Sequence, residues 1–379
     1  MSFFSKKNSY LGVDIGANGI KIVELKKNKR RPQLWTYGVL DEPLDIHLPA
    51  ATQDLMLKGK WQSNEKAKES AQLIQLSPGN QSQVEKYGRL LTSLIKAART
   101  ESQSVTASIP VSQVFHALLT LPSVPEKELS ALIVSEVKKL LPLPLDEMQI
   151  THQKIPRTSK AEAEKYQQLL VTAAPKSTVA FYTAIFEKAG LQLHELETEA
   201  FALERSLVGH DTATVMVVDI GAERTNFFII DQGLPLTHRT IHLGGELFDE
   251  RLAKRLGVEP KYIPQMKDDM ARVSQGERCG GVFDDLIESI TKEVQYSFDL
   301  FLNQMGHEQK RPEKIILTGG MAVLGAIEEY LSKAFPLKVF VGDPWARVVY
   351  HQRLKAVLDN LGPRMAVSIG LALRNIVGV

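Results

Sequence analysis

Two stretches of the chain share one pattern of apolar and polar positions. Residues 10–25 (YLGVDIGANGIKIVEL) and 215–230 (VMVVDIGAERTNFFII) each contain an apolar run that ends at an aspartate, a turn of small or polar residues, and a second apolar run. The pattern predicts a β-hairpin in each stretch, with Asp14 and Asp219 near the turns. Because the copies are so alike, they predict two related lobes, each offering one carboxylate and its turn amides to a shared cleft.

The remaining apolar pattern predicts mixed α/β structure. A third strand follows each hairpin, at residues 33–39 and 236–241. Apolar residues at helical spacing predict helices over residues 84–99, 126–140, 176–189, 199–207, 246–256, 283–302, 325–334 and 365–376. Shorter apolar runs predict strands over residues 105–109, 191–196, 315–317 and 339–341.

One group of elements predicts a unit of its own, a candidate inserted subdomain over about residues 112–175. Its strands and its helix are expected at 114–121, 126–140, 149–154 and 168–173. Ser123, three residues before Glu126, is typical of a capping box that opens the helix.

Two polar segments interrupt this order. Residues 41–83 contain prolines and a glycine without a sustained period, and they predict an irregular excursion with one short helix around 65–74. Residues 260–281 are also polar and predict a loop.

Composition excludes several classes of protein. With 46 basic and 44 acidic residues the formal net charge is +2, which gives no reason to expect nucleic-acid binding. The single cysteine, Cys279, rules out an internal disulfide and fits a reducing cytoplasm. No apolar run approaches the roughly 18 residues that a membrane-spanning helix needs. If this protein works at a membrane, something else must take it there.

The residue types in the two turns indicate phosphate and metal chemistry. Gly16 and Gly221 allow the backbone to turn and to approach an anion without a Cβ in the way. Asp14 and Asp219 would repel phosphate but suit a hydrated Mg²⁺ ion, which keeps its waters and takes few carboxylates. The alternative is an ordinary hairpin turn at the end of a buried strand, and the repetition of the motif favours the site.

Two further glycine pairs suit a nucleotide. Gly244 and Gly245 precede the helix 246–256, so its amides and its dipole favour phosphate. Gly319 and Gly320 follow the strand 315–317, where a bare backbone can lie flat against a base or a ribose. Each pair alone is also compatible with a tight connection.

Together these motifs resemble the actin–Hsp70–sugar kinase superfamily. DIGANGIK (14–21) and DIGAERT (219–225) resemble its two phosphate loops, and LGGE (243–246) and LTGGM (317–321) resemble its later nucleotide elements. Within the superfamily the chain is most similar to the PilM family of type IV pilus assembly, and LPSVPEKELSALIVSEVKKLLPLPLDEMQI and HLGGELFDERLAKRLG add to the likeness. The resemblance implies an α/β actin-like ATPase fold, with two ribonuclease-H-like lobes around a nucleotide cleft and an FtsA-like 1C subdomain.

The resemblance also implies where the subdomains lie. The expected ranges are 1A at 1–111 with 176–212 and 365–379, 1C at 112–175, 2A at 213–245 with 303–364, and 2B at 246–302.

ATP and Mg²⁺ are the ligands that the resemblance implies. Asp14 and Asp219 would hold the metal through water, and Glu199 would be the catalytic residue that orients a water molecule. The residues implied to contact the nucleotide, with Lys292 placed near the base, are Gly16, Ala17, Asn18, Gly19, Lys21, Gly221, Thr225, Gly244, Gly245, Lys292, Gly319, Gly320 and Met321.

The phosphate loops depart from the family pattern in two ways. The first loop has no hydroxyl at 17–19, where relatives usually carry one. The second loop has Glu223, which would repel a γ-phosphate, and Arg224, which would compensate. We therefore expect ATP binding with weak or absent hydrolysis.

The family likeness implies a partner as well. PilM-type proteins bind the N-terminal cytoplasmic tail of the membrane protein PilN in a groove between 1A and 1C. The strand 114–121 and the helix 126–140 are the candidate surface here, and an extended peptide would add to a strand edge or lie in an apolar groove. The alternative is that the apolar face of the helix packs on its own sheet. We expect a peripheral protein of the inner membrane, held in the pilus inner-membrane complex by this partner.

Two other functions remain as alternatives. An FtsA-like division protein would self-associate into filaments and would need an amphipathic C-terminal membrane helix, whereas this sequence reaches Val379 directly after its closing helix. A small-molecule kinase would need a catalytic aspartate near 191–207, where the acidic residues are glutamates.

Overall fold

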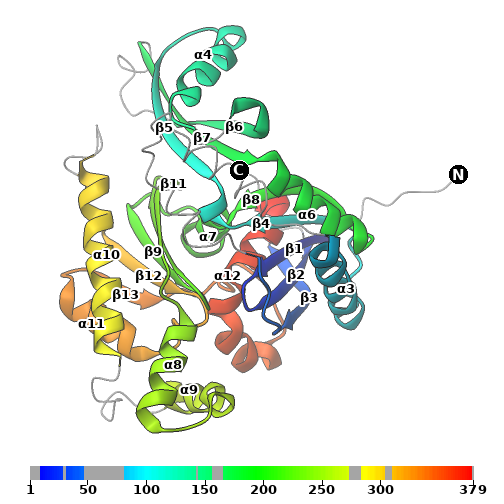
Figure 1. Cartoon of the computed structure of the whole chain (residues 1–379), viewed down its shortest axis with the longest axis vertical. Helices are drawn as coiled ribbons and strands as arrows, with labels where there is room; N and C mark the ends of the chain where they lie inside the picture. The colour runs from blue at the N-terminus through cyan, green and yellow to red at the C-terminus, as the bar shows by residue number, and fades with distance from the viewer. Residues whose placement is uncertain are drawn as a thin grey trace, which may run out of the picture.

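The computed structural model describes residues 9–28, 31–46, 81–141, 144–155, 165–272, 283–303 and 310–377. These residues form two five-stranded sheets and one three-stranded sheet (Figure 1). The first sheet has the order β3-β2-β1-β4-β8, the second β11-β10-β9-β12-β13, and the third β5-β7-β6.

The strand bounds follow the apolar runs of the sequence closely. The first sheet consists of β1 (Ser9–Gly16), β2 (Gly19–Lys27), β3 (Pro32–Leu40), β4 (Ser104–Ile109) and β8 (Gln192–Thr198). The second consists of β9 (Val215–Ile220), β10 (Thr225–Asp231), β11 (Leu234–Ile241), β12 (Lys314–Thr318) and β13 (Lys338–Val341). The third consists of β5 (Phe115–Pro122), β6 (Met148–Ile155) and β7 (Tyr166–Pro175).

The two five-stranded sheets have the same topology, as the repeated hairpin predicts. Each begins with three antiparallel strands and adds two parallel strands beside the first of them. In the first sheet Asp14 lies opposite Lys21, and in the second Asp219 lies opposite Asn226. Both predicted hairpins are therefore confirmed, with equivalent registers at the two aspartates.

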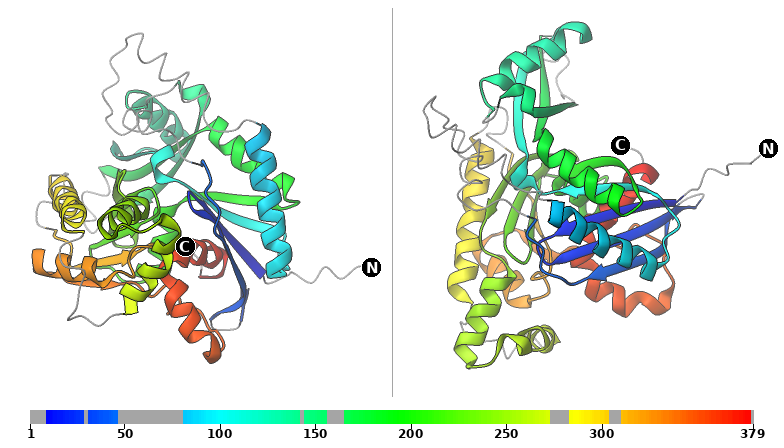
Figure 2. Two further views of the ribbon diagram at one scale, coloured as in Figure 1. Left: turned by 60° about the horizontal axis from the view of Figure 1, so that its bottom comes forward. Right: turned by 45° about the vertical axis from the view of Figure 1, so that its right-hand side comes forward.

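The helices cover the outer faces of the sheets and fill the space between them. The α-helices are α3 (Gln81–Ala98), α4 (Glu126–Lys138), α6 (Lys176–Lys188), α7 (Glu199–Leu203), α8 (Gly245–Leu256), α9 (Ile263–Arg272), α10 (Asp284–Leu302), α11 (Gly325–Ala334) and α12 (Lys355–Val377). A π-helical turn (Glu204–Val208) continues α7, and short 3₁₀ turns are η1 (Val111–Gln113), η2 (Leu145–Glu147), η4 (Pro260–Tyr262) and η5 (Gln352–Leu354). Helices α3 and α6 pack together beside the first sheet, while α10 and α11 lie beside the second (Figures 1 and 2).

The three-stranded sheet and α4 project from the rest of the molecule, as the right-hand view of Figure 2 shows. The buried face of α4 consists of Leu129, Ile133 and Val137, which pack in one cluster with apolar residues of β5 and β7. The predicted strand–helix–strand–strand unit is therefore confirmed. It also contacts the second sheet, because the rings of His116 on β5 and His238 on β11 lie 4.9 Å apart.

Three of the sequence predictions were wrong: the cap of one helix, the absence of another helix, and the start of the closing helix. Ser123 does not cap α4, because Pro125 occupies the N-cap position and the Ser123 amide continues the strand by donating to the carbonyl of Lys165. The predicted loop 260–281 contains α9. The closing helix begins at Lys355, ten residues earlier than predicted, and contains Pro363. The helix expected around 65–74 lies outside the described residues.

Helix α12 lies between the two five-stranded sheets and contacts both (Figure 1). It presses directly on β1 at Gly12, where a Cβ would overlap the carbonyl of Ser368. It presses equally closely on α7 at Gly370, where a Cβ would overlap the carbonyl of Ala202. Among the helices that the structure describes, none has both the length and the apolar character required for crossing a bilayer.

We predict that Gly370→Ala destabilises the protein, because its methyl group meets backbone that cannot rotate away. The expected loss in free energy of unfolding is about 1–3 kcal/mol, the usual cost of an added methyl group in a closely packed interior. Urea unfolding followed by circular dichroism measures it. The matched control is Gly325→Ala in α11, where a Cβ meets nothing within 4 Å. Equal stability of the two variants would contradict the close contact.

Candidate functional site

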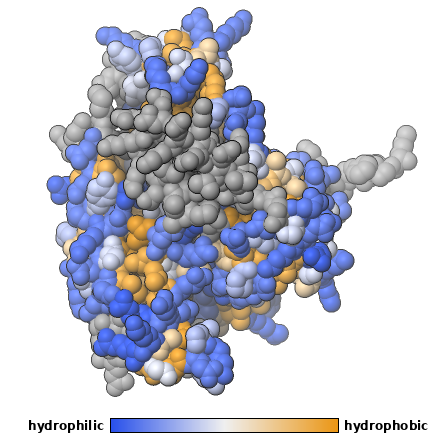
Figure 3. All heavy atoms as spheres, viewed as in Figure 1, coloured by the Kyte–Doolittle hydropathy of each residue, from blue (hydrophilic) through white to orange (hydrophobic). Residues whose placement is uncertain are grey.

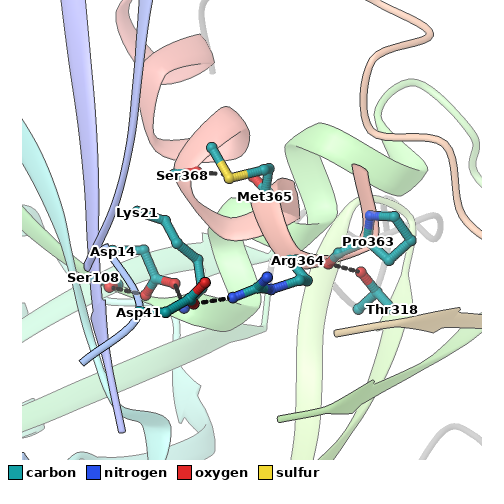
Figure 4. Close-up of polar contacts among 9 residues, drawn as sticks. All are labelled: Asp14, Lys21, Asp41, Ser108, Thr318, Pro363, Arg364, Met365 and Ser368. Carbon is teal, nitrogen blue, oxygen red and sulfur yellow. Dashed lines mark hydrogen bonds and ion pairs between the residues drawn. The ribbon is translucent and has the colours of Figure 1, made fainter. Parts of the chain in front are cut away.

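Asp14 is held at the end of β1 by groups from two neighbouring strands. The hydroxyl of Ser108 on β4 donates to Oδ1 of Asp14 at 2.8 Å, and Nζ of Lys21 on β2 lies 3.5 Å from Oδ2 (Figure 4). Asp14 is only 7% exposed. A buried carboxylate with one cation at this distance still has a net attraction for a further positive group.

Asp219 occupies the equivalent position at the end of β9. Burial, reinforced by the negative charge of Asp14, raises the pKa of Asp219 to about 6. The hydrogen bond from Asn226 and the charge of Lys21 act in the opposite direction and are weaker. The two aspartates are thus near enough to repel each other, as the paired hairpins predict.

Glu199 joins the two aspartates as a third carboxyl group. It is the first residue of α7, and its Oε2 accepts a hydrogen bond of 3.3 Å from the amide of Val111. Burial raises the pKa of Glu199 to about 8, and the charges of Asp219 and then Asp14 add to the effect. At neutral pH this carboxyl is mostly protonated, so it acts as a base only after it loses its proton.

The three carboxyl groups suit a cation, because positive charge would relieve their repulsion and lower the raised pKa values of Asp219 and Glu199. A hydrated Mg²⁺ ion fits Asp14 and Asp219, since it retains waters and requires few direct protein ligands. Within the described ranges, no set of three His, Cys, Asp or Glu side chains is arranged to hold a metal ion directly.

The first turn is built differently from the sequence interpretation. Gly19, rather than Gly16, has the left-handed backbone, with φ of 113°, and the carbonyl of Leu40 leaves no room there for a Cβ. A Cβ at Gly16 would come only to 3.4 Å from Nζ of Lys21. The carbonyl of Ala17 accepts from the amide of Leu44, and Asn18 is exposed at the tip of the turn. The turn therefore places Lys21 directly beside the backbone of Gly16.

The second turn is closed by helix α8. The amides of Gly245 and Glu246 donate to the carbonyls of Gly221 and Ala222 at 2.8 and 2.9 Å. These amides at the start of α8 thus hold the second turn in place. Gly244 fits the same contact, since a Cβ there would overlap the carbonyl of Ala222.

Thr225 contributes to this contact as well. It is fully buried, and its hydroxyl donates to the carbonyl of Leu243 at 2.6 Å. The structure therefore brings Thr225 and the glycine pair 244–245 together with the second turn, as a support for its backbone.

The third glycine element packs on Asp219 itself. Gly319 has φ of 88°, and a Cβ there would lie 2.7 Å from Oδ1 of Asp219. The next glycine, Gly320, is exposed, and the side chain of Met321 is buried against Gly245. Nζ of Lys267 on α9 reaches the sulfur of Met321 at 3.9 Å.

The structure does not bring Lys292 to these residues. Lys292 lies on the outer side of α10, where its side chain is 75% exposed and pairs with Glu288 at 2.7 Å. Lys267 is the lysine that reaches Met321, and it also pairs with Asp249 of α8 at 2.6 Å. Interpreting 260–281 as a loop hid this residue, although Ile263 and Met266 pack on the core.

A second cation borders the first turn from α12. Arg364 forms an ion pair with Asp41, which follows β3 (Figure 4). The neighbouring carbonyl of Pro363 accepts from the hydroxyl of Thr318 and the amide of Gly319, both at 3.0 Å. Helix α12 therefore contacts the part of the site that belongs to each lobe: Asp41 after β3 of the first sheet, and the end of β12 in the second. The sequence did not predict these contacts.

We predict that the wild-type protein loses stability as pH rises from about 4.5 to about 8. The pKa of Glu199 is raised from 4.5 to about 8 in the folded chain, so in this window the folded state binds more protons than the unfolded state. Glu199→Gln stays neutral and should be more stable than wild type above pH 8, by roughly 1–3 kcal/mol, since one pKa unit corresponds to about 1.4 kcal/mol.

Thermal unfolding of both proteins between pH 4 and pH 9 measures this difference. Glu128→Gln, at an exposed position of α4, is the control and should keep the wild-type pH profile. Parallel profiles for wild type and Glu199→Gln would contradict the assignment of Glu199 to the cluster.

Comparisons with known proteins agree with this architecture. The family described as type IV pilus assembly protein PilM matches residues 54–376. A solved PilM-PilN type IV pilus biogenesis complex contains a chain 23% identical to this one, with a TM-score of 0.76 and with 97% of this chain and 99% of that chain covered. The ethanolamine utilization protein EutJ from Carboxydothermus hydrogenoformans is 14% identical, with a TM-score of 0.51 and coverage of 96% and 89%. The predicted fold is confirmed, and the chain belongs to the PilM family of actin-like type IV pilus assembly proteins.

Proposed function

We propose that this protein binds ATP with Mg²⁺ between its two hairpins and serves as a cytoplasmic adaptor in type IV pilus assembly, where it holds the N-terminal tail of a PilN-like membrane protein. The observation that carries the nucleotide part is the convergence of Asp14 and Asp219, near enough that one raises the pKa of the other. Family membership supports the pilus part and favours it over an FtsA-like filament protein or a small-molecule kinase.

In this proposal each hairpin supplies one half of the nucleotide site. Asp14 and Asp219 hold the hydrated metal, and Lys21 with the first turn contacts the phosphates. The loop 319–321 flanks the adenosine, and Lys267 on α9 takes the place that the sequence assigned to Lys292. Without a ligand the pKa of Glu199 is about 8, so this carboxyl is mostly protonated near neutral pH and becomes a base only once a bound cation lowers that pKa.

A groove between the first sheet and the three-stranded sheet supports the partner part. It encloses a cavity of about 220 Å³. One wall is β8, the outermost strand of the first sheet, and the other is a face of β6 and β7. The residues that line the groove are Ile109, Val114, Gln149, Thr151, Thr172, Ala174, Val179, Thr183 and 193–198. An extended peptide can pair with the backbone of an outermost strand and place alternate side chains against the opposite wall.

This groove lies between the elements expected in 1A and in 1C, as the resemblance implies, but its walls are not the strand 114–121 and the helix 126–140 that the sequence suggested. The apolar face of α4 packs on its own sheet through Leu129 and Ile133, so it is not free to bind a tail. Val134 and Leu140 are exposed on or just after α4, where apolar side chains come to the surface near the top of Figure 3. Of the predicted strand 114–121, Val114 is the residue that lines the groove. We propose that the groove holds the tail and thereby keeps the protein at the inner membrane.

The nucleotide proposal predicts that Asp14→Asn and Asp219→Asn each weaken Mg²⁺-dependent ATP binding. The expected loss is about 10- to 100-fold, the usual effect of removing a carboxylate that holds a metal through its outer shell. Titration calorimetry with folded protein measures it. Asp299→Asn, at an exposed position of α10, is the control and should bind like wild type. Failure of the folded wild type to take up any adenine or guanine nucleotide would end the proposal.

The partner proposal predicts that Thr151→Trp blocks the groove. Thr151 is exposed on β6 and lines the groove, so an indole ring there fills space that the peptide needs. Binding of a synthetic PilN N-terminal peptide, followed by fluorescence anisotropy, should weaken by about tenfold or more, which corresponds to 1.4 kcal/mol of steric cost.

The matched control is Thr120→Trp on β5, an exposed position of the same sheet outside the groove lining. This variant should bind the peptide as wild type does. Stronger inhibition by Thr120→Trp than by Thr151→Trp would return the binding surface to β5 and α4.

A further inference from the structure

One side chain of the second turn crosses to the segment that leads into the three-stranded sheet. Nη1 of Arg224 donates to the hydroxyl of Ser112 at 2.6 Å. Ser112 lies in η1, directly before β5. Ser112 is 3% exposed and Arg224 is 6% exposed. This buried contact therefore joins the second lobe to the start of the projecting unit.

The guanidinium group also borders the carboxylate cluster. Arg224 interacts electrostatically with Glu199, which in turn interacts with Asp14 and Asp219. Nη2 of Arg224 lies 3.8 Å from Glu223 in the same turn. Lys21 contacts Asp14 from the first turn, and Arg224 approaches Glu199 from the second, so the cluster has one cation from each lobe.

The hydroxyl of Ser112 is uncharged, whereas the guanidinium group of Arg224 that donates to it is positively charged. Phosphate oxygens carry negative charge and accept from guanidinium more strongly, often through two parallel hydrogen bonds. An anion held between the aspartates and their cation would therefore compete with Ser112 for Arg224. The terminal phosphate of a triphosphate adds the charge and the length that a diphosphate lacks.

We propose that Arg224 reads the terminal phosphate of the bound nucleotide, and that it exchanges the hydroxyl of Ser112 for a phosphate oxygen when a triphosphate is present. Arg224 is then a specificity-determining residue that favours triphosphate over diphosphate. This inference rests on the proposed nucleotide site and adds to it the residue that distinguishes the two ligands.

The exchange has a direct consequence for the partner groove. Ser112 lies between Ile109 and Val114, which both line the groove. The amide of Val111 is bonded to Glu199, whose neighbour Thr198 lines the groove as well. Release of Ser112 therefore loosens the connection between β4 and β5, while the contact of His116 with His238 persists beside it.

The test compares the affinities of Mg²⁺–AMP-PNP and Mg²⁺–ADP by titration calorimetry for wild type and four variants. Wild type should prefer AMP-PNP. Arg224→Ala should bind AMP-PNP about 10- to 100-fold more weakly while its affinity for ADP changes little, as expected for the loss of a charge-assisted hydrogen bond. Arg224→Lys, which keeps the charge and most of the volume, should show an intermediate loss.

The variant Ser112→Ala tests whether Arg224 binds the terminal phosphate or only packs in the interior. This variant removes the competing partner, so it should bind AMP-PNP several-fold more tightly than wild type, within the range of one neutral hydrogen bond. Arg239→Ala removes a partly buried arginine that pairs with Glu293 in the same lobe, and it should leave both affinities unchanged.

Hydrogen exchange of the amides at 111–116 provides a second measurement. Exchange there should increase in Ser112→Ala without nucleotide, and in wild type on addition of AMP-PNP but not of ADP. Retention of the wild-type preference by Arg224→Ala and Arg224→Lys, or weaker AMP-PNP binding by Ser112→Ala, overturns the inference while the nucleotide site stands. If wild type binds no nucleotide, the proposed function falls and this inference falls with it.

Discussion

The close packing of helix α12 on β1 and on α7 sets the geometry on which the rest of the structure depends. At Gly12 and at Gly370 backbone lies against backbone, so no side chain can act as a spacer. The carbonyl of Pro363 in the same helix accepts two hydrogen bonds from the end of β12, which lies beside Asp219. One helix thus fixes the ends of both sheets at short range, and the separation of the two aspartates follows from it.

This geometry creates an electrostatic cost within the fold. Asp14 is buried and Asp219 and Glu199 are half-buried, and desolvation together with the neighbouring carboxylates raises the pKa values of Asp219 and Glu199 to about 6 and about 8. A protein under selection for stability alone would gain from replacing these groups with neutral ones. Carboxyl groups that oppose folding are typical of sites where a ligand supplies the missing charge, and the hydrated Mg²⁺ ion that we propose would supply it here.

The sequence predicted the parts of this site that depend on local pattern. Alternation of apolar and polar positions on both sides of a short turn is enough to place Asp14 and Asp219 at equivalent ends of two hairpins. The local sequence pattern does not show which glycine has the unusual backbone. A glycine is required at position 19 because Leu40 approaches it from another strand. The same holds for Lys267, since its contact with Met321 depends on how α9 packs. The groove has no sequence signal, because its walls come from distant segments.

The two proposed sites share two short segments of chain. In the first segment, Ile109 and Val114 line the groove and Ser112 between them contacts Arg224 of the second turn. In the second, residues 195–198 line the groove and lead directly to Glu199 of the carboxylate cluster. A hydrogen bond from Val111 to Glu199 ties these segments together. Coupling therefore needs no long path of intermediate residues, only a shift of one bonded pair of segments. By thermodynamic linkage, a tail that moves this pair changes nucleotide affinity by the same factor as the nucleotide changes affinity for the tail.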